Sequence, residues 1–88
     1  MMKDYMNFVR HELIGLKVNV KKSKNVSQEK ISGIVIDETK NMLIIEYKGR
    51  EVMIPKKDTL FEFEIGEKKI EIDGNLLIGR PEDRLKKW

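Results

Sequence analysis

The sequence predicts a small, mostly β protein: an antiparallel barrel of five to six strands with an N-terminal and a C-terminal helix. Two observations support this fold class. Apolar and polar residues alternate with a period of two at residues 16–21 and 59–65, as in strands with one buried face. Residues 30–37 and 42–47 are apolar on both faces, and the terminal helices are the only candidates to cover the second face. Turn residues separate these stretches, and many short strands in a small chain favour a barrel over an open sheet. We expect one domain, 1–88, with the barrel at 16–79.

The first predicted element is a helix over residues 3–13, where apolar side chains recur at helical spacing on one face. At Leu16 the period changes to two, because Leu16, Val18 and Val20 alternate with polar residues. We therefore expect the first strand at residues 16–21, followed by a polar loop at 22–28.

Turn residues set the limits of the remaining strands. Asn41 tolerates the positive φ that the turn at 37–41 can need, and Lys48 and Gly49 are expected to form a two-residue hairpin loop. Gly33 is expected to mark a bend or bulge where the barrel closes. The predicted strands are residues 30–37, 42–47, 50–54, 59–65, 68–72 and 76–78.

A tight turn at residues 73–75 introduces the last strand, and the C-terminal helix is predicted over residues 81–87. Pro81 suits the first turn of a helix, where its missing N–H costs nothing. Acidic residues follow at the positive end of the helix dipole, and Lys86 and Lys87 lie at its negative end. A compact basic helix is therefore expected to project from the barrel.

The basic charge is concentrated towards the two ends of the chain. Residues 1–30 contain seven Lys/Arg and three Asp/Glu, residues 31–78 contain seven and ten, and residues 79–88 contain four and two. A basic surface assembled from separate segments is the electrostatic footprint of nucleic-acid binding. The candidates for phosphate contact are Lys17, Lys21, Lys22, Lys24, Arg80, Arg84, Lys86 and Lys87.

An acidic face is expected on the later strands, where carboxylates alternate with core positions. Phosphate would be repelled by this face, so RNA is expected to approach elsewhere. The phenylalanines of the same strands are assigned to the core, which disfavours base stacking on the sheet. The acidic residues are Glu62, Glu64, Glu71 and Asp73.

Composition excludes or disfavours several kinds of site. The chain has no cysteine and one histidine, which excludes a disulfide and a Cys/His zinc site. Asp37 and Glu38 could suggest a metal-dependent nuclease, but neighbouring residues in a turn rarely converge on one ion, and turn capping explains them better. We therefore predict no catalytic residue, no metal ligand and no bound cofactor.

The chain has no apolar run of about 18 residues, so no membrane span is predicted. Its N-terminus also lacks the charged and then apolar pattern of a signal peptide. These two observations predict a cytoplasmic protein.

Five segments resemble archaeal ribonuclease P protein component 1, the Sm-like subunit of the ribonucleoprotein that processes the 5′ end of tRNA. They occur in order between residues 11 and 86, and the two longest are the most specific. The segments are HELIGLKV (His11–Val18), GIVIDETKNMLII (Gly33–Ile45), REVMIPK (Arg50–Lys56), LFEFE (Leu60–Glu64) and LLIGRPEDR (Leu76–Arg84).

The resemblance implies an Sm-like barrel and an RNA-binding subunit that helps the catalytic RNA to remove the 5′ leader from precursor tRNA. The endoribonuclease activity would belong to the ribonucleoprotein, with magnesium used by the RNA and no catalytic group in this chain. The implied partners are the specificity part of ribonuclease P RNA, a zinc-ribbon protein subunit and, indirectly, precursor tRNA. Tyr5, Phe8 and Val9 would contact the zinc-ribbon subunit, and the eight basic residues would contact RNA.

Three alternatives remain open at this point. A free-standing Sm-like RNA chaperone would form a ring by pairing strand edges between subunits. An SH3-like protein-interaction module would need an aromatic-lined groove, for which six scattered aromatic residues are too few. A nuclease based on Asp37 and Glu38 would require the chain alone to cut RNA.

Overall fold

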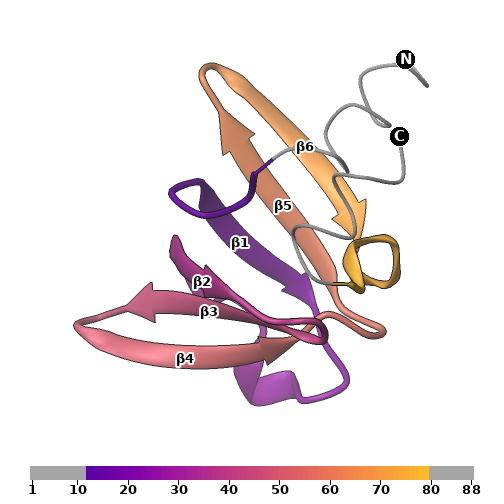
Figure 1. The fold of residues 1–88 in the computed structure, drawn as a ribbon. Coiled ribbons are helices and arrows are strands. Elements are labelled where there is room, and N and C mark those ends of the chain that lie inside the picture. The colour runs from indigo at the N-terminus through magenta and orange to yellow at the C-terminus, as the bar shows by residue number, and fades with distance from the viewer. Residues whose placement is uncertain (1–11, 80–88) are drawn as a thin grey trace.

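The computed structural model describes residues 12–79 and contains six antiparallel strands in one sheet (Figure 1). Two short 3₁₀ helices, η1 (Val26–Gln28) and η2 (Gly74–Leu77), follow the first and last strands. The predicted mostly β fold class is therefore confirmed. The strands are β1 (Lys17–Lys22), β2 (Ser32–Glu38), β3 (Met42–Tyr47), β4 (Arg50–Pro55), β5 (Leu60–Ile65) and β6 (Lys68–Asp73).

The sheet is strongly bent and has the strand order β4-β3-β2-β1-β5-β6. In Figure 1, β3 and β4 lie at a steep angle to β5 and β6, with β1 between the two arms. No hydrogen-bonded pair joins the edge strands β4 and β6 within residues 12–79. The barrel expected from the sequence is thus open along this seam.

One apolar core lies within the bent sheet, and every strand contributes to it. Strand alternation explains which residues enter the core, because Val18 and Val20 of β1 are buried while Asn19 between them lies on the opposite face and is half-buried. Phe61 and Phe63 of β5 are fully buried as predicted, with ring centroids 6.0 Å apart. The core residues are Leu13, Val18, Val20, Ile31, Val35, Leu43, Ile45, Ile54, Phe61, Phe63, Ile72 and Leu77.

Gly33 does not form the bulge that the sequence suggested. The register of β2 on β3 shifts between Val35 and Asp37, further along the strand. At Gly33 the β3 backbone approaches so closely that a Cβ atom would overlap the carbonyl oxygen of Glu46. The glycine is therefore needed for the approach of two backbones, which is the other common role of glycine in a strand.

Two backbone expectations at turns have opposite outcomes. The β3–β4 hairpin is confirmed, because Lys48 and Gly49 both adopt positive φ angles of 51° and 77°. Asn41 does not adopt a positive φ. Instead, Lys30 has a φ of 73°, so β2 begins at Ser32 and not at Lys30 as predicted.

The strand predicted at residues 76–78 is wrong, because the 3₁₀ helix η2 occupies residues 74–77. The Asp73 carboxylate accepts the backbone N–H of Asn75 at 2.9 Å and caps the helix. Gly74 N–H donates to the Thr59 carbonyl at 2.7 Å, and Leu77 is buried in the core. Capping by Asp73 and burial of Leu77 therefore favour a 3₁₀ helix where the short apolar run had suggested a strand.

The two predicted terminal helices fall largely outside the described residues. Glu12 and Leu13, the last two residues of the predicted helix 3–13, are described and are not helical. The predicted helix 81–87 lies wholly outside the described range.

Candidate nucleic-acid interface

The four lysines predicted to contact RNA near the start of the chain lie on the surface, on β1 and the loop after it. Lys17, Lys21, Lys22 and Lys24 are all exposed. Strand alternation accounts for the position of Lys17, because it turns the side chain away from the core residue Val18. Lys21 lies where the register of β1 on β5 shifts.

The lysines of β1 are not separate from the predicted acidic face, because they lie beside its glutamates on the same sheet surface. Antiparallel pairing places Lys17 opposite Glu64, with Nζ 3.8 Å from the carboxylate. Lys21 Nζ lies 3.9 Å from the Glu62 carboxylate. Asn19 donates from Nδ2 to both glutamates, at 3.0 Å to Glu62 and 3.4 Å to Glu64. The outer surface of β1 and β5 is therefore a mixed-charge face.

The charges on this face remain available to a polyanion. Exposed ion pairs contribute about 0–1 kcal/mol and exchange partners readily in water. The Lys17 side chain is 56% exposed in its pair with Glu64. Breaking such a pair costs little, but a phosphate bound to the lysine would lie near the glutamate charge and be repelled by it.

Lys24 forms the shortest of the exposed ion pairs, with Nζ 2.9 Å from the Asp58 carboxylate. Hydrogen bonds from Lys24 and then from Asn75 hold the pKa of the Asp58 carboxyl below its ordinary value. Lys22 makes no ion pair with another residue of the range 12–79. Three of the four predicted lysines therefore have a carboxylate partner, and Lys22 has none among residues 12–79.

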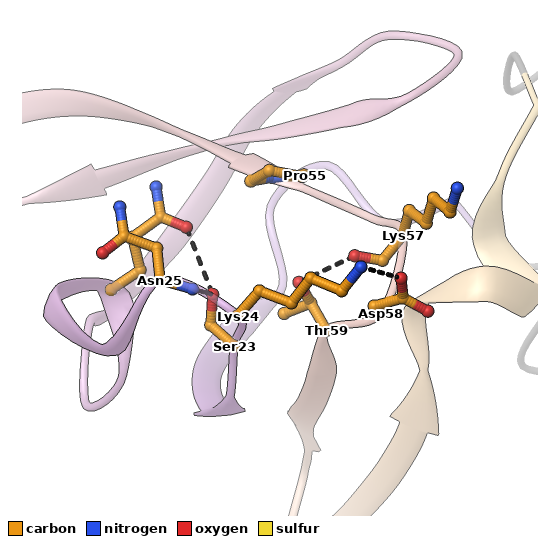
Figure 2. A pocket seen from close by; sticks show the side chains of 8 residues that line it. Ser23, Lys24, Asn25, Pro55, Lys57, Asp58 and Thr59 are labelled. Carbon is orange, nitrogen blue, oxygen red and sulfur yellow. Dashed lines mark hydrogen bonds and ion pairs between the residues drawn. The ribbon is translucent and has the colours of Figure 1, made fainter.

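A hollow of about 250 Å³ lies beside the Lys24–Asp58 pair (Figure 2). One wall is the loop containing η1, and the other is the segment joining β4 to β5. The lining residues are Ser23, Lys24, Asn25, Gln28, Pro55, Lys57, Asp58 and Thr59.

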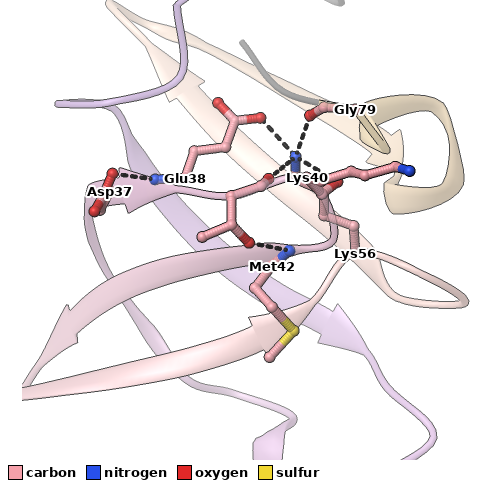
Figure 3. Close-up of polar contacts among 7 residues, drawn as sticks. Asp37, Glu38, Lys40, Met42, Lys56 and Gly79 are labelled. Carbon is pink, nitrogen blue, oxygen red and sulfur yellow. Dashed lines mark hydrogen bonds and ion pairs between the residues drawn. The ribbon is translucent and has the colours of Figure 1, made fainter.

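Lys56 is a buried charged residue that the sequence interpretation missed. Its ammonium lies 2.7 Å from the Glu38 carboxylate, and both side chains are completely buried (Figure 3). The same ammonium donates to the carbonyl oxygens of Thr39 at 2.7 Å, Gly79 at 3.0 Å and Lys40 at 3.3 Å. The local sequence gives no reason to expect Lys56 to be buried and the adjacent Lys57 to be exposed. It shows only that Lys56 directly follows Pro55, the last residue of β4.

Lys56 joins the β2–β3 turn to the end of the described chain. The Gly79 carbonyl accepts a hydrogen bond from the Lys56 ammonium, and the Gly79 N–H donates to the Lys40 carbonyl at 2.8 Å. These bonds place the start of the basic C-terminal segment beside the β2–β3 turn. Lys56 therefore positions Gly79, the last described residue, relative to the β2–β3 turn.

The Asp37–Glu38 pair does not form a shared metal site. Glu38 points to Lys56, whereas Asp37 is exposed and accepts the Glu38 N–H at 2.8 Å. Both residues belong to β2 and not to the predicted turn, and the side chain of Glu38 serves the buried ion pair. Residues 12–79 contain no group of three or more His, Cys, Asp or Glu that could hold a metal ion. No helix in this part of the chain is long and apolar enough to span a bilayer.

Several predicted contact residues lie outside the described range. They include the three residues assigned to the zinc-ribbon subunit and half of those assigned to RNA. These residues are Tyr5, Phe8, Val9, Arg80, Arg84, Lys86 and Lys87.

Comparison with known proteins supplies the family. The sequence model of the family "Ribonuclease P/MRP, subunit p29" matches residues 6–87. The chain belongs to the p29 family. The resemblance inferred from five short segments is thereby confirmed.

Members of the p29 family from archaea are similar to this chain over nearly its whole length. Ribonuclease P protein component 1 of Methanocaldococcus jannaschii is 55% identical over 82 residues, which cover 92% of this chain and 86% of the relative. The protein of the same name from Methanococcus vannielii is 47% identical over 91 residues, covering 98% and 92%.

The fold comparison agrees with the family assignment. A solved structure described as Mth11, a homologue of human RNase P protein Rpp29, has a TM-score of 0.62 and 46% identity. The match covers 84% of this chain and 97% of that chain. The bent six-stranded sheet is therefore the fold of a p29 protein.

Proposed function

We propose that this chain is an RNA-binding subunit of ribonuclease P that helps the catalytic RNA to remove the 5′ leader from precursor tRNA. The observation that carries the proposal is the 55% identity to a ribonuclease P protein component 1 over 92% of the chain. The exposed lysines of β1 and its loop support a role in contacting phosphates.

The chain's contribution is electrostatic and structural. Lysines neutralise phosphates where RNA segments come close together, which lowers the magnesium required for folding and tightens binding of precursor tRNA. The RNA uses the magnesium and carries the active site, and this chain supplies no catalytic group. Residues 12–79 carry twelve basic and twelve acidic side chains, so the excess positive charge of the chain lies in residues 1–11 and 80–88.

The proposed partners are the specificity part of ribonuclease P RNA and a zinc-ribbon protein subunit, in the cytoplasm. Tyr5, Phe8 and Val9 are assigned to the protein partner, and the lysines of β1 with the 80–87 segment to the RNA. Cysteine is absent from this chain, so the zinc would belong to the partner.

Equilibrium binding tests the proposal directly. The full chain, with and without the zinc-ribbon subunit, is titrated into ribonuclease P RNA and into an unrelated structured RNA of equal length, across a salt series. We expect preference for ribonuclease P RNA, strengthened by the partner, with affinity falling steeply as salt rises. Equal binding to both RNAs would contradict the proposal, and cleavage of precursor tRNA by the chain alone would contradict its non-catalytic role.

One structural observation favours a second function, that of a free-standing Sm-like RNA chaperone. The edge strands β4 and β6 have unpaired outer edges within the described range, and such edges can pair between subunits to form a ring. Sedimentation separates the two functions. A monomer or a heterodimer with the zinc-ribbon subunit supports the ribonuclease P subunit, and a hexamer or heptamer supports the chaperone.

A further inference from the structure

The hollow beside β4 has the features of a binding site that the family assignment does not explain. It is formed by two segments far apart in sequence, residues 23–28 and 55–59. The two segments are joined across it by the ion pair between Lys24 and Asp58, at 2.9 Å. The hollow therefore lies between two separate segments of the chain and is not formed by one loop alone.

The hollow is lined by two lysines, one aspartate and five uncharged residues. Lys24 and Lys57 lie at its rim, and the Lys57 side chain projects into solvent (Figure 2). Pro55 offers an exposed ring on one side. On the other side, Asn25 uses its carbonyl oxygen to cap η1, accepting the Ser27 N–H at 3.1 Å. This leaves its amide N–H₂ pointing away from the cap and able to donate to a ligand.

We infer that this hollow binds one nucleotide of an RNA strand, with a backbone phosphate held between Lys24 and Lys57. The inference rests on the proposed function and names the part of the surface that carries it out. Lysine suits phosphate as a flexible point charge, and an apolar ring with a nearby amide suits the attached nucleoside. Lys22, two positions before Lys24 in the chain, is also exposed.

Asp58 is the competitor of the phosphate in this arrangement. In the free protein its carboxylate holds the Lys24 ammonium, and Asn75 holds the carboxylate through a second hydrogen bond of 3.4 Å. Bound phosphate would take over Lys24 and lie near the Asp58 charge. Asp58 therefore keeps Lys24 ordered at the hollow and also opposes binding of the anion.

Because Asp58 opposes binding of the phosphate, a substitution that removes its charge should strengthen binding of RNA. Asp58→Asn removes one negative charge, keeps the acceptor that Asn75 uses, and suits the left-handed backbone at this position, where φ is 57°. The matched control is Glu67→Gln, which removes the same charge from an exposed residue in the β5–β6 turn, about 20 Å away along β5. We expect Asp58→Asn to tighten binding of ribonuclease P RNA about two- to five-fold, the range of an exposed ion pair, and Glu67→Gln to have a smaller effect.

Removing the two lysines tests the site from the other direction. Lys24→Ala and Lys57→Ala should each weaken binding and reduce the slope of log affinity against log salt by about one. Lys68→Ala, an exposed lysine beside the β5–β6 turn, is the charge-matched control and should leave the slope nearly unchanged. All five variants change exposed side chains, and thermal unfolding of the full chain checks that each is folded.

The possible outcomes separate this inference from the function on which it rests. If the natural chain prefers ribonuclease P RNA but the hollow variants match their controls, the inference is overturned and the proposed function stands. If the natural chain shows no preference for this RNA, both fail. Opposite shifts for Asp58→Asn and Lys57→Ala, each larger than its control, establish the site.

Discussion

At the scale of single residues, the most consequential side chain is Lys56. Burying an ammonium group costs several kcal/mol unless it is paired and hydrogen-bonded. Lys56 meets this requirement with one carboxylate and three carbonyl oxygens, all within 3.3 Å. Its burial therefore specifies the relative positions of the β2–β3 turn, the end of β4 and Gly79.

The first prediction concerns this ion pair. Lys56→Met leaves the Glu38 carboxylate buried without its cation, so the free energy of unfolding should fall by about 3–5 kcal/mol. The double variant Lys56→Met, Glu38→Met removes the unpaired charge and should recover part of the loss. Urea unfolding measures both.

If Lys56→Met does not fold, Glu38→Gln provides the same comparison at lower cost, because the amide oxygen still accepts a hydrogen bond. A Lys56→Met protein within about 1 kcal/mol of the natural chain would show that the pair is not buried as described.

The second prediction concerns the pKa of Asp58. Lys24 lowers this pKa in the folded protein, so the pair stabilises the fold above the unfolded-state pKa. That stabilisation is lost as the pH falls through the folded-state pKa. In Lys24→Ala, an NMR titration should show the Asp58 midpoint moving up towards its ordinary value. An unchanged midpoint would mean that Lys24 does not hold the carboxylate in solution.

At the scale of secondary-structure elements, the packing of β2 against β3 depends on a missing side chain. Gly33 lets the β3 backbone approach until a Cβ would overlap the Glu46 oxygen, with Ile45 also close by. The obstacle is backbone and not the end of a flexible side chain, so the strands themselves would have to move.

The third prediction follows from this contact. Gly33→Ala should lower the free energy of unfolding by about 1–3 kcal/mol or more, because the added methyl group overpacks the strand pair. The control is Gly66→Asn, where φ is 61° and nothing lies within 4 Å of the added Cβ. Asparagine tolerates that backbone conformation, so this variant should be nearly neutral. Equal effects of the two substitutions in thermal or urea unfolding would contradict the close approach.

At the scale of the whole molecule, the charge distribution separates the barrel from the chain ends. Residues 12–79 have equal numbers of basic and acidic side chains, so the net charge of +3 resides in the terminal segments. Under the proposed function, long-range attraction of RNA should depend strongly on those segments, with the lysines of the barrel acting at short range. Lys56 and Gly79 place the start of one such segment against the β2–β3 turn.

The fourth prediction tests the role of the C-terminal segment. Arg80→Glu together with Arg84→Glu should weaken binding of ribonuclease P RNA and reduce the salt slope by about two or more. Lys48→Glu with Arg50→Glu, at the β3–β4 hairpin, makes the same change of charge on exposed residues elsewhere. An identical loss in both double variants would show that net charge alone controls affinity, and unchanged affinity in the first would remove the segment from the interface.

The sequence by itself determined six of the strands, the hairpin and the family, because these depend on local patterns, whereas the strand predicted at residues 76–78 is a 3₁₀ helix. Residues 42–47 form β3 with the predicted limits, since an apolar run between two turns is a local signal. The family followed from short segments in order along the chain. Residue roles in RNA binding were proposed from charge alone and stay predictions.

Only the tertiary structure decided which charged residues meet. The pairing of Lys17 with Glu64 depends on the register between β1 and β5, which lie far apart in sequence. Lys56 and Lys57 are the same residue type at adjacent positions, yet one is buried and the other lies at the rim of the hollow. Lys56 is buried because Gly79 and the β2–β3 turn both supply carbonyl oxygens to its ammonium. The residues next to Lys56 in the sequence contain no information about these distant contacts.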